Sequence, residues 1–270
     1  MNDYIIRKYI PEDKDQVSVL WKTIFDDDIE FIDFFLDTFL NIGDGYVCAD
    51  GENIVSIAFL LGDLFYKSVP CHYLYAVATD PAYRSKGIAS EVVKTAVADV
   101  KKNNHIILTA PADNSLVSWY QINMESEDTL TCSIRYVEKN NLINDYAGIP
   151  IARINADEYL SIRENLLLNY DHIVIGKEYM KIQEHLCKTY QGALIKSGEN
   201  IAAVYLDEKE LYCPELLCTP SDLEQFIKSI MDLFGVHSVT FRTSGKDKDY
   251  VSLYTPVSIP DDALFNLILD

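Results

Sequence analysis

Arg84, Lys86 and Gly87 lie close enough in the sequence to bind one bulky anion together. The two side chains carry positive charge, and Gly87 has no side chain, so backbone can approach a ligand there. Apolar residues then recur at helical spacing from Ile88 to Val100. The first N–H groups of such a helix have no intrahelical acceptor, and the positive end of the helix dipole lies beside them. The segment therefore predicts a phosphate-binding loop at a helix N-terminus.

The residues before this loop predict a strand, because Tyr73–Thr79 is rich in aromatic and β-branched side chains and Asp80-Pro81 ends it. The loop fits neither G-x-x-x-x-G-K-[ST] nor G-x-G-x-x-G, so the usual signatures of nucleotide loops are missing. Instead, Arg84–Ala89 fits [QR]-x-x-G-x-[GA] and follows a D-P-x-Y sequence. This pattern resembles motif A of the GNAT N-acetyltransferases.

The resemblance implies acetyl-coenzyme A as co-substrate, with its pyrophosphate held by the loop and the helix start. The residues implied for the pyrophosphate are Arg84, Ser85, Lys86, Gly87, Ile88, Ala89 and Ser90. In the family, main-chain groups of the preceding strand contact the pantetheine arm, which implicates Val77 and Thr79 here. The alternative from the residues alone is a basic strand-to-helix turn that binds nothing.

A second segment bears on catalysis. Asn114–Met124 (NSLVSWYQINM) predicts a helix, with Asn114 as its N-cap. It resembles the family signature N-x(n)-[LF]-Y-x-K-x-G-F, whose Tyr is the usual general acid for the coenzyme A thiolate. The match implies that Tyr120 is the acid and Asn114 a cofactor contact, although Met124-Glu125 replaces Gly-Phe. A phenol with a pKa near 10 remains protonated at neutral pH and can donate to a thiolate. The alternative is that Tyr120, one of 18 tyrosines, only packs in the core.

The general base is not identified by the sequence. Many members of the family use a Glu on the strand before the loop, whereas Tyr75 and Ala76 stand there. His72 is a lone strand histidine, which is more often structural than catalytic. Tyr73, Tyr75, a water chain or binding of the neutral amine remain equally open.

The elements around these segments predict an α/β (α+β) fold over residues 1 to about 140. Asp3–Ile10 alternates as a first strand, two helices follow, and a hairpin turns at Asp50–Asn53. His105–Ala110 predicts a short buried strand and Thr129–Glu138 a last one. The order β-αα-βββ-α-β-α-β resembles the GNAT fold, a mixed central sheet flanked by helices.

The second predicted helix, which ends at about Leu40, combines apolar and acidic residues. Its apolar surface exceeds what one buried face needs, and Asp26, Asp27, Asp28, Glu30, Asp33 and Asp37 lie in the same region. In the family this helix pair flanks the acceptor pocket, so the segment is compatible with a pocket wall and an acidic rim. A helix buried on two sides with a solvated acidic face is the equally open alternative.

The second half of the chain contains an internal repeat of the first. Gly45–Ile54 matches Gly192–Ile201, and Leu211–Pro220 and His237–Phe241 resemble Leu74–Pro81 and His105–Thr109. Two predicted helices, at about 156–168 and 176–190, precede this repeat.

The repeat predicts a degenerate GNAT-like domain at 150–270 after a GNAT domain at 1–140, with the boundary in the polar segment 139–150. After Pro220 comes Ser221-Asp222-Leu223-Glu224, whose carboxylates repel a pyrophosphate. This copy is not expected to bind coenzyme A. The arrangement is most similar to the Eis-like branch without its third domain.

Composition limits the partners. The net charge of −19 argues against nucleic acid or an anionic membrane and is compatible with a cationic small molecule. Six cysteines show no C-x-x-C pair, so reduced thiols and no metal are expected. No signal-peptide pattern or membrane-length apolar run is present, which favours a soluble cytoplasmic protein. A homo-oligomer is compatible with the sequence.

The function expected from the resemblance is acetyl transfer from acetyl-coenzyme A to a primary amine of a small or cationic acceptor, by direct transfer. One alternative is a catalytically inactive acyl-coenzyme A-binding regulatory or scaffolding protein, which the absent base and the lost Gly-Phe favour. A third candidate, an aminoacyl-tRNA-dependent transferase, is disfavoured by the acidity and the intact loop. The acceptor, the acyl chain length and the role of the second domain are left open.

Overall fold

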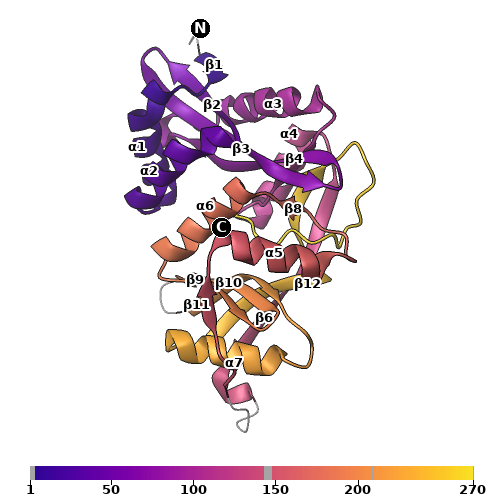
Figure 1. The fold of residues 1–270 in the computed structure, drawn as a ribbon. Helices are drawn as coiled ribbons and strands as arrows, with labels where there is room; N and C mark the ends of the chain where they lie inside the picture. Colours follow the sequence, from indigo (N-terminus) through magenta and orange to yellow (C-terminus); the bar gives the residue numbers. More distant parts are fainter. Residues whose placement is uncertain (1–3, 143–147, 208–209, 270) are drawn as a thin grey trace. The chain divides into compact units, whose positions relative to one another are not determined.

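The computed structural model describes residues 4–142, 148–207 and 210–269 (Figure 1). The chain divides into two compact units, each of them discontinuous in sequence. Unit 1 comprises residues 1–129 and 250–259, and unit 2 comprises residues 130–249 and 260–270. The predicted boundary segment 139–150 includes residues 143–147, which lie outside the described residues, and the sequential domain limits stay a prediction.

Unit 1 follows the predicted order of elements as far as its last helix, but the predicted last strand, Thr129–Glu138, is found as β6 (Asp128–Glu138), which pairs with β12 (Ser238–Tyr254) and lies almost wholly in unit 2. The helices and strands of unit 1 are β1 (Tyr4–Lys8), α1 (Lys14–Phe25), α2 (Ile29–Thr38), β2 (Gly43–Asp50), β3 (Asn53–Tyr66), β4 (Val69–Thr79), α3 (Ile88–Lys101), β5 (Ile106–Thr109) and α4 (Val117–Met124). In the described part of the chain, short 3₁₀ segments lie at Pro11–Asp13, Phe39–Asn41, Pro81–Tyr83, Asn114–Leu116 and Lys139–Asn141. The predicted first strand begins at Asp3, which lies outside the described residues.

The sheet of unit 1 is mixed. Strands β1 to β4 are antiparallel neighbours in sequence order, and β5 lies parallel to β4. The other edge of β5 pairs antiparallel with Ser252–Tyr254, near the C-terminal end of β12 (Ser238–Tyr254). A strand from the last part of the chain therefore completes the sheet of unit 1.

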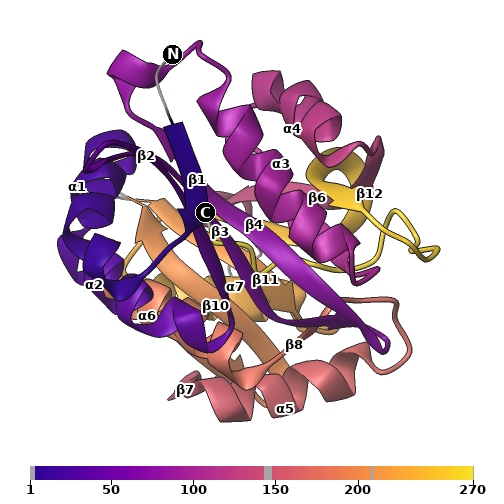
Figure 2. The ribbon, with the colours of Figure 1, turned by 90° about the horizontal axis from the view of Figure 1, so that it is seen from above.

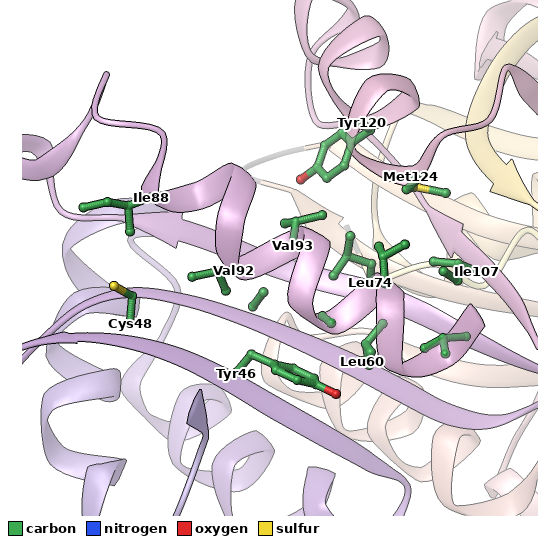
Figure 3. Packing of buried hydrophobic residues seen from close by; sticks show 14 of the residues in the cluster. Tyr46, Cys48, Leu60, Leu74, Ile88, Val92, Val93, Ile107, Tyr120 and Met124 are labelled. Atoms are coloured by element: carbon green, nitrogen blue, oxygen red, sulfur yellow. The ribbon is translucent and has the colours of Figure 1, made fainter. Parts of the chain in front are cut away.

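Helices cover both faces of this sheet (Figure 2). On one face, α1 and α2 pack an aromatic core that includes Trp21, Phe35 and Phe59. On the other face, the apolar side of α3 and the end of α4 form a second cluster with strand residues such as Leu60 and Leu74 (Figure 3). Alternation along β3 and β4 sends neighbouring residues to opposite faces, which is why both strands are apolar almost throughout.

Unit 2 repeats this arrangement. It contains β6 (Asp128–Glu138), β7 (Ala152–Ile154), α5 (Ala156–Leu167), β8 (Val174–Ile175), α6 (Lys177–Thr189), β9 (Ala193–Ser197), β10 (Asn200–Asp207), β11 (Glu210–Leu217), α7 (Leu223–Phe234) and most of β12. The strand order is β7-β9-β10-β11-β12, with β6 paired to β12. Strand β11 lies parallel to β12, as β4 does to β5.

The helices of unit 2 also lie on both sides of its sheet (Figure 1). Helix α7 packs its apolar side, including Phe226 and Ile230, on the strands, and α5 and α6 contact β9 and β10. Gly235, at φ +69°, ends α7 in the left-handed conformation expected of a C-terminal glycine. The predicted fold class, a GNAT-like α/β unit followed by a second degenerate copy, is confirmed.

Candidate functional site

Strand β4 contains a bulge in its C-terminal half. Phe59 of β3 pairs with Tyr75, whereas Ile57 pairs with Ala78, so β4 has one residue more than β3 between these pairs. Ala76 lies in the left-handed region at φ +48°, which costs a non-glycine residue about 1–2 kcal/mol. A bulge re-aims main-chain groups and side chains away from the regular ladder. Strained backbone of this kind is typical of functional sites.

The pairing of β4 with β5 ends just before this bulge. It runs from Cys71 with Ile106 to Tyr73 with Leu108. At the next position the Thr109 hydroxyl donates to the Leu74 carbonyl at 3.0 Å. Beyond this contact the main chain of β4, up to Thr79, is not paired with β5 in the described part of the chain.

The two strand residues implicated by the resemblance lie in the part of β4 that is not paired with β5. Val77 is half-buried and belongs to the rim of the α3-side core cluster. The Thr79 hydroxyl lies 2.8 Å from Ser56 Oγ, and the Thr79 carbonyl accepts a hydrogen bond from Arg84 Nε at 3.2 Å. Arg84 thus ties the loop to the end of the strand.

The loop between β4 and α3 is exposed and partly preorganised. Asp80 caps the 3₁₀ segment by accepting from Ala82 N at 2.8 Å. Ser85, at φ +62°, and Gly87, at φ +78°, both adopt left-handed backbone, and nothing lies within 4 Å of the position that a Gly87 Cβ would occupy. Lys86 Nζ lies 4.5 Å from the centre of the Tyr83 ring, a cation–π contact.

Helix α3 begins directly after this loop. Its first backbone bond within the helix is from Glu91 N to the Gly87 carbonyl at 3.1 Å. The N–H groups of Ile88, Ala89 and Ser90 precede that bond, so they have no intrahelical acceptor. Open space, positive side chains and unpaired donors at one helix start fit a bulky phosphate.

Tyr120 projects from α4 into the core cluster on the α3 side of the sheet (Figure 3). Its side chain is 9% exposed, and its hydroxyl end is directed away from Met124. Burial raises the pKa of Tyr120 to about 12, while a hydrogen bond with Thr109 lowers it. The phenol therefore keeps its proton at any physiological pH, as a general acid must.

Asn114 lies in a different environment from Tyr120. It is exposed and is the first residue of a 3₁₀ segment, and Asp113 is the capping residue, with its carboxylate accepting from Ser115 N at 2.7 Å. The expectation that Asn114 is the N-cap is therefore wrong, because Asp113 has the extended backbone that a cap needs. Its role as a cofactor contact stays a prediction.

His72, one of the candidate base residues, lies on the N-terminal half of β4. His72 pairs with Ile107, before the strands part, and its Nε2 lies 3.0 Å from Nδ1 of His105. Burial, followed by the effect of His105, lowers the pKa of His72 to about 4. These contacts give His72 a structural partner away from the bulge.

The aromatic residues of α2 are mostly core. Phe31, Phe35 and Phe39 are completely buried, and the ring of Trp21 lies 5.6 Å from that of Tyr75 in an edge-to-face contact. Ile29 and Leu40 are the apolar residues of this region that remain about half exposed. The surplus apolar surface is therefore limited to the two ends of the helix.

Several carboxylates of the acidic run have partners. Lys22 pairs with Asp26 at 2.8 Å, Lys14 pairs with Asp37 at 2.6 Å, and Trp21 Nε1 donates to Asp27 at 2.7 Å. Asp28 and Glu30 are exposed. The rim is therefore less negative than the sequence alone indicates.

The helix start of unit 2 has the opposite charge. Asp222 precedes α7, accepts a hydrogen bond from Asn200 Nδ2 at 2.8 Å, and is followed by Glu224 in the first turn. A hydrogen bond from Asn200 is the largest of the effects that hold the pKa of Asp222 below its usual value. Carboxylates at this place repel a pyrophosphate, so unit 2 is still expected not to bind coenzyme A.

Two further residues of the site were not expected from the sequence. Ala76 could not be identified from the sequence, because an alanine inside an apolar strand does not indicate a bulge. Thr109 ends a short buried strand, which is an ordinary place for a threonine. All six cysteines are free, no group of three or more metal-ligating side chains occurs among the described residues, and no helix of the described chain is long and apolar enough to cross a membrane.

Comparison with known proteins agrees with this geometry. Residues 10–123 match the model of the acetyltransferase (GNAT) family. No match to a curated protein was found.

Several solved structures resemble the whole chain. A conserved protein of Enterococcus faecalis V583, described as a probable N-acyltransferase, has a TM-score of 0.67 at 14% identity, covering 93% of this chain and 72% of its own. Eis1 from Mycobacterium abscessus has a TM-score of 0.63 at 10% identity, with 93% and 73% covered. A tandem GNAT protein from the clavulanic acid biosynthesis pathway has a TM-score of 0.60 at 11% identity, with 91% of both chains covered. At these identities the likeness establishes the fold.

Proposed function

We propose that this chain, whose residues 10–123 match the model of the acetyltransferase (GNAT) family, transfers an acetyl group from acetyl-coenzyme A to a primary amine. The observation that carries the proposal is the parting of β4 and β5 at a bulge, with the open helix start of α3 at one end and Tyr120 buried in the core cluster on the α3 side of the same sheet. These observations correspond to what acyl transfer from a thioester needs. The helix start can anchor the cofactor, the part of the β4 main chain that is not paired with β5 can donate hydrogen bonds to the thioester, and Tyr120 can supply a proton.

The residues from Arg84 to Ser90 are the proposed pyrophosphate contacts, through the N–H groups of the first turn and the two cationic side chains. Gly87 keeps this approach free of a side chain. Main-chain groups of Val77 and Thr79 would lie along the pantetheine arm. Bound acetyl-coenzyme A supplies an activated acyl carbon and a thiolate leaving group.

Tyr120 is the proposed general acid. As the C–N bond forms and the C–S bond breaks, its O–H proton passes to the departing sulfur, which leaves the phenol as a phenolate. The acylated nitrogen then loses one proton to solvent, and the phenolate takes a proton from solvent, which restores the acid. A buried, fully protonated phenol is suited to this step because a thiolate at the same place would otherwise be poorly solvated. The amine enters in its neutral form, since the structure gives no residue the role of base.

Tyr120→Phe tests the proposal because it keeps the ring and removes the proton donor. With acetyl-coenzyme A and a panel of primary amines, kcat should fall roughly 10²-fold while affinity for acetyl-coenzyme A stays near that of the wild type. Chromatography of the acetylated product should follow the reaction. Tyr136→Phe, on an exposed tyrosine of β6, is the matched control.

The alternative is a protein that binds acyl-coenzyme A without transferring the acyl group. It is favoured by the position of Glu125, which ends α4 in left-handed backbone at φ +55°, next to the place where the family signature has glycine. One acetyl-coenzyme A bound per chain in calorimetry, with no product from any amine in the panel, would support this alternative. Equal turnover by the wild type and by Tyr120→Phe would assign the proton to another group.

A further inference from the structure

Tyr83 has a defined position because it contacts two strands of the sheet of unit 1. Its hydroxyl donates to Asp50, the last residue of β2, with 3.0 Å between the phenol oxygen and Oδ2. Its ring makes an edge-to-face contact with Tyr4 of β1, with 6.3 Å between the ring centres. The same ring packs at the edge of the core cluster on the α3 side of the sheet. The ring is therefore anchored by the sheet, although it belongs to the loop between β4 and α3.

The Tyr83 ring in turn orders Lys86. Lys86 Nζ lies 4.5 Å from the ring centre, where the negative face of the ring attracts an ammonium. Lys86 is exposed, and an exposed lysine without such a contact samples many rotamers. A ligand that binds such a side chain must restrict this freedom, which weakens binding. A lysine that already rests on an aromatic face loses less freedom, so the contact favours an anion at this place.

The second cation of the loop is also held by the protein. Arg84 Nε donates to the Thr79 carbonyl at the end of β4, with 3.2 Å between the two atoms. A guanidinium has five N–H groups, and this hydrogen bond uses one of them. Both cations that precede the open helix start of α3 therefore have defined positions before any ligand binds.

We propose that Tyr83 is a positioning residue for the pyrophosphate of acetyl-coenzyme A, because it holds the Lys86 ammonium beside the start of α3. The inference rests on the proposed function, in which this loop binds the pyrophosphate. An ammonium has three N–H groups, so it can keep one side on the ring and donate from the other to phosphate oxygens. Tyr83 acts through Lys86 and needs no contact of its own with the ligand.

The first experiment compares two acetyl donors in the full chain. S-acetylpantetheine has the same thioester and arm as acetyl-coenzyme A but no pyrophosphate. In Tyr83→Leu, KM for acetyl-coenzyme A should rise roughly two- to fivefold with kcat unchanged, which is the size of an exposed cation–π contact. The value of kcat/KM for S-acetylpantetheine should stay at that of the wild type. Tyr83→Phe keeps the ring face and should behave as the wild type with both donors.

A loss of the same size with both donors would mean that Tyr83 serves the fold of unit 1 and not the pyrophosphate. A Phe variant as weak as the Leu variant would assign the effect to the hydroxyl. Tighter binding of acetyl-coenzyme A by Tyr83→Leu would mean that the ring competes with the ligand for Lys86. Each of these results would overturn the proposal.

A double-mutant cycle tests whether Tyr83 acts through Lys86. By calorimetry, Lys86→Gln should weaken binding of acetyl-coenzyme A roughly tenfold, and adding Tyr83→Leu should have almost no further effect. Lys67→Gln is the matched control, because Lys67 is also exposed and lies over a tyrosine ring, that of Tyr66, at 4.9 Å. It should bind as the wild type does. Equal losses from Tyr83→Leu with and without Lys86 would overturn the proposal.

A third readout needs no ligand. The ring current of Tyr83 should shift the NMR signals of the Lys86 side-chain methylene groups upfield, and the shift should vanish in Tyr83→Leu and persist in Tyr83→Phe. An unshifted Lys86 in the wild type would show that the ring does not hold it. A wild type that binds no acetyl-coenzyme A would instead overturn the assignment of the loop, and the role of Tyr83 with it. A wild type that binds the cofactor but acetylates no amine would overturn the proposed transfer alone, since calorimetry then still measures the role of Tyr83.

Discussion

Arg163 and Glu215 form an ion pair inside unit 2, with Arg163 Nε 3.0 Å from Glu215 Oε2 and both side chains 0% exposed. Tyr159 donates to the same carboxylate oxygen at 3.1 Å, and Arg163 Nη1 donates to the Ile173 carbonyl at 3.2 Å. Glu215 lies on β11, which takes the place in unit 2 that β4 takes in unit 1. The second copy thus contains a closed, internally neutralised charge network where the first has an open strand edge.

Removing one partner of this pair should destabilise the fold strongly. Glu215→Gln removes the buried counter-charge of Arg163 and leaves it only the partly exposed Glu164, 2.9 Å from Nη1, so the free energy of unfolding should fall by up to about 3–5 kcal/mol. Denaturant unfolding followed by circular dichroism measures this change. Glu158→Gln breaks a partly exposed pair with Lys196 and should cost less than about 1 kcal/mol. Similar small losses in both variants would mean that the buried pair adds nothing specific.

Gly87→Asp should abolish binding of acetyl-coenzyme A. The change places a negative carboxylate at the open helix start, and it forces a side chain into backbone at φ +78°. Gly235→Asp is the matched control, because Gly235 has φ +69° and equally open surroundings but lies at the end of α7. Both variants should lose similar stability, and calorimetry should show one site per chain in the control and none in Gly87→Asp. Undiminished affinity in Gly87→Asp, or two sites in the wild type, would contradict the assignment of the loop.

The elements of the first half could be predicted from sequence because local signals agree there. The spacing of apolar residues from Ile88 to Val100 fits one face of a helix, and Asp80-Pro81 ends the strand before it. The bulge at Ala76 could not be predicted, since its left-handed backbone is imposed by the pairing of β4 with β3 on one side only. The hydrogen bond from Thr109 to the Leu74 carbonyl depends on the same parting of strands, which is a tertiary property.

The length of β12 was also not predictable. Its predicted part, His237–Phe241, is apolar, but the observed strand continues through a polar stretch to Tyr254. That stretch lacks a hydrophobic pattern, and it is held by pairing with β6 and then with β5. Long-range partners, and not local propensity, fix such a strand.

This pairing predicts that the N-terminal part of the chain will not fold as a separate piece. In a fragment of residues 1–149, the edge of β5 that pairs with Ser252–Tyr254 is left open. The fragment also loses Tyr254, whose ring lies 4.2 Å from Lys101 Nζ and packs at the edge of the core cluster. An exposed apolar edge strand favours aggregation, so the fragment should be poorly folded and should not bind acetyl-coenzyme A.

Fusing residues 250–259 to residues 1–129 through a flexible linker should restore folding and acetyl-coenzyme A binding. Heteronuclear NMR spectra measure the first and calorimetry the second. The same linker carrying residues 250–259 in scrambled order is the control. Full binding by the simple fragment would show that β5 does not need its second neighbour.

The acceptor is expected to be cationic and partly apolar, such as a polyamine or a basic peptide terminus. The acidic run beside α2 holds six carboxylates, and Lys14 and Lys22 pair with some of them, so a negative excess remains. Opposite charge would concentrate such an acceptor near the site, and salt would screen the attraction. Raising ionic strength to about 0.5 M should therefore raise KM for the acceptor far more than KM for acetyl-coenzyme A.

Charge reversal tests the same electrostatic attraction of the acceptor at low salt. Asp28→Lys with Glu30→Lys changes two exposed carboxylates and leaves Asp27 on Trp21, so the fold should be retained. KM for the acceptor should rise as it does in high salt. Glu199→Lys with Glu224→Lys, both exposed in unit 2, changes the net charge equally and should leave that KM unchanged. Two results would contradict this prediction: a preference for a neutral or anionic acceptor, or a KM for the acceptor that changes neither with salt nor with charge reversal. In either case the acidic run is a solvated helix face, and its carboxylates serve only the ion pairs and the tryptophan contact already described.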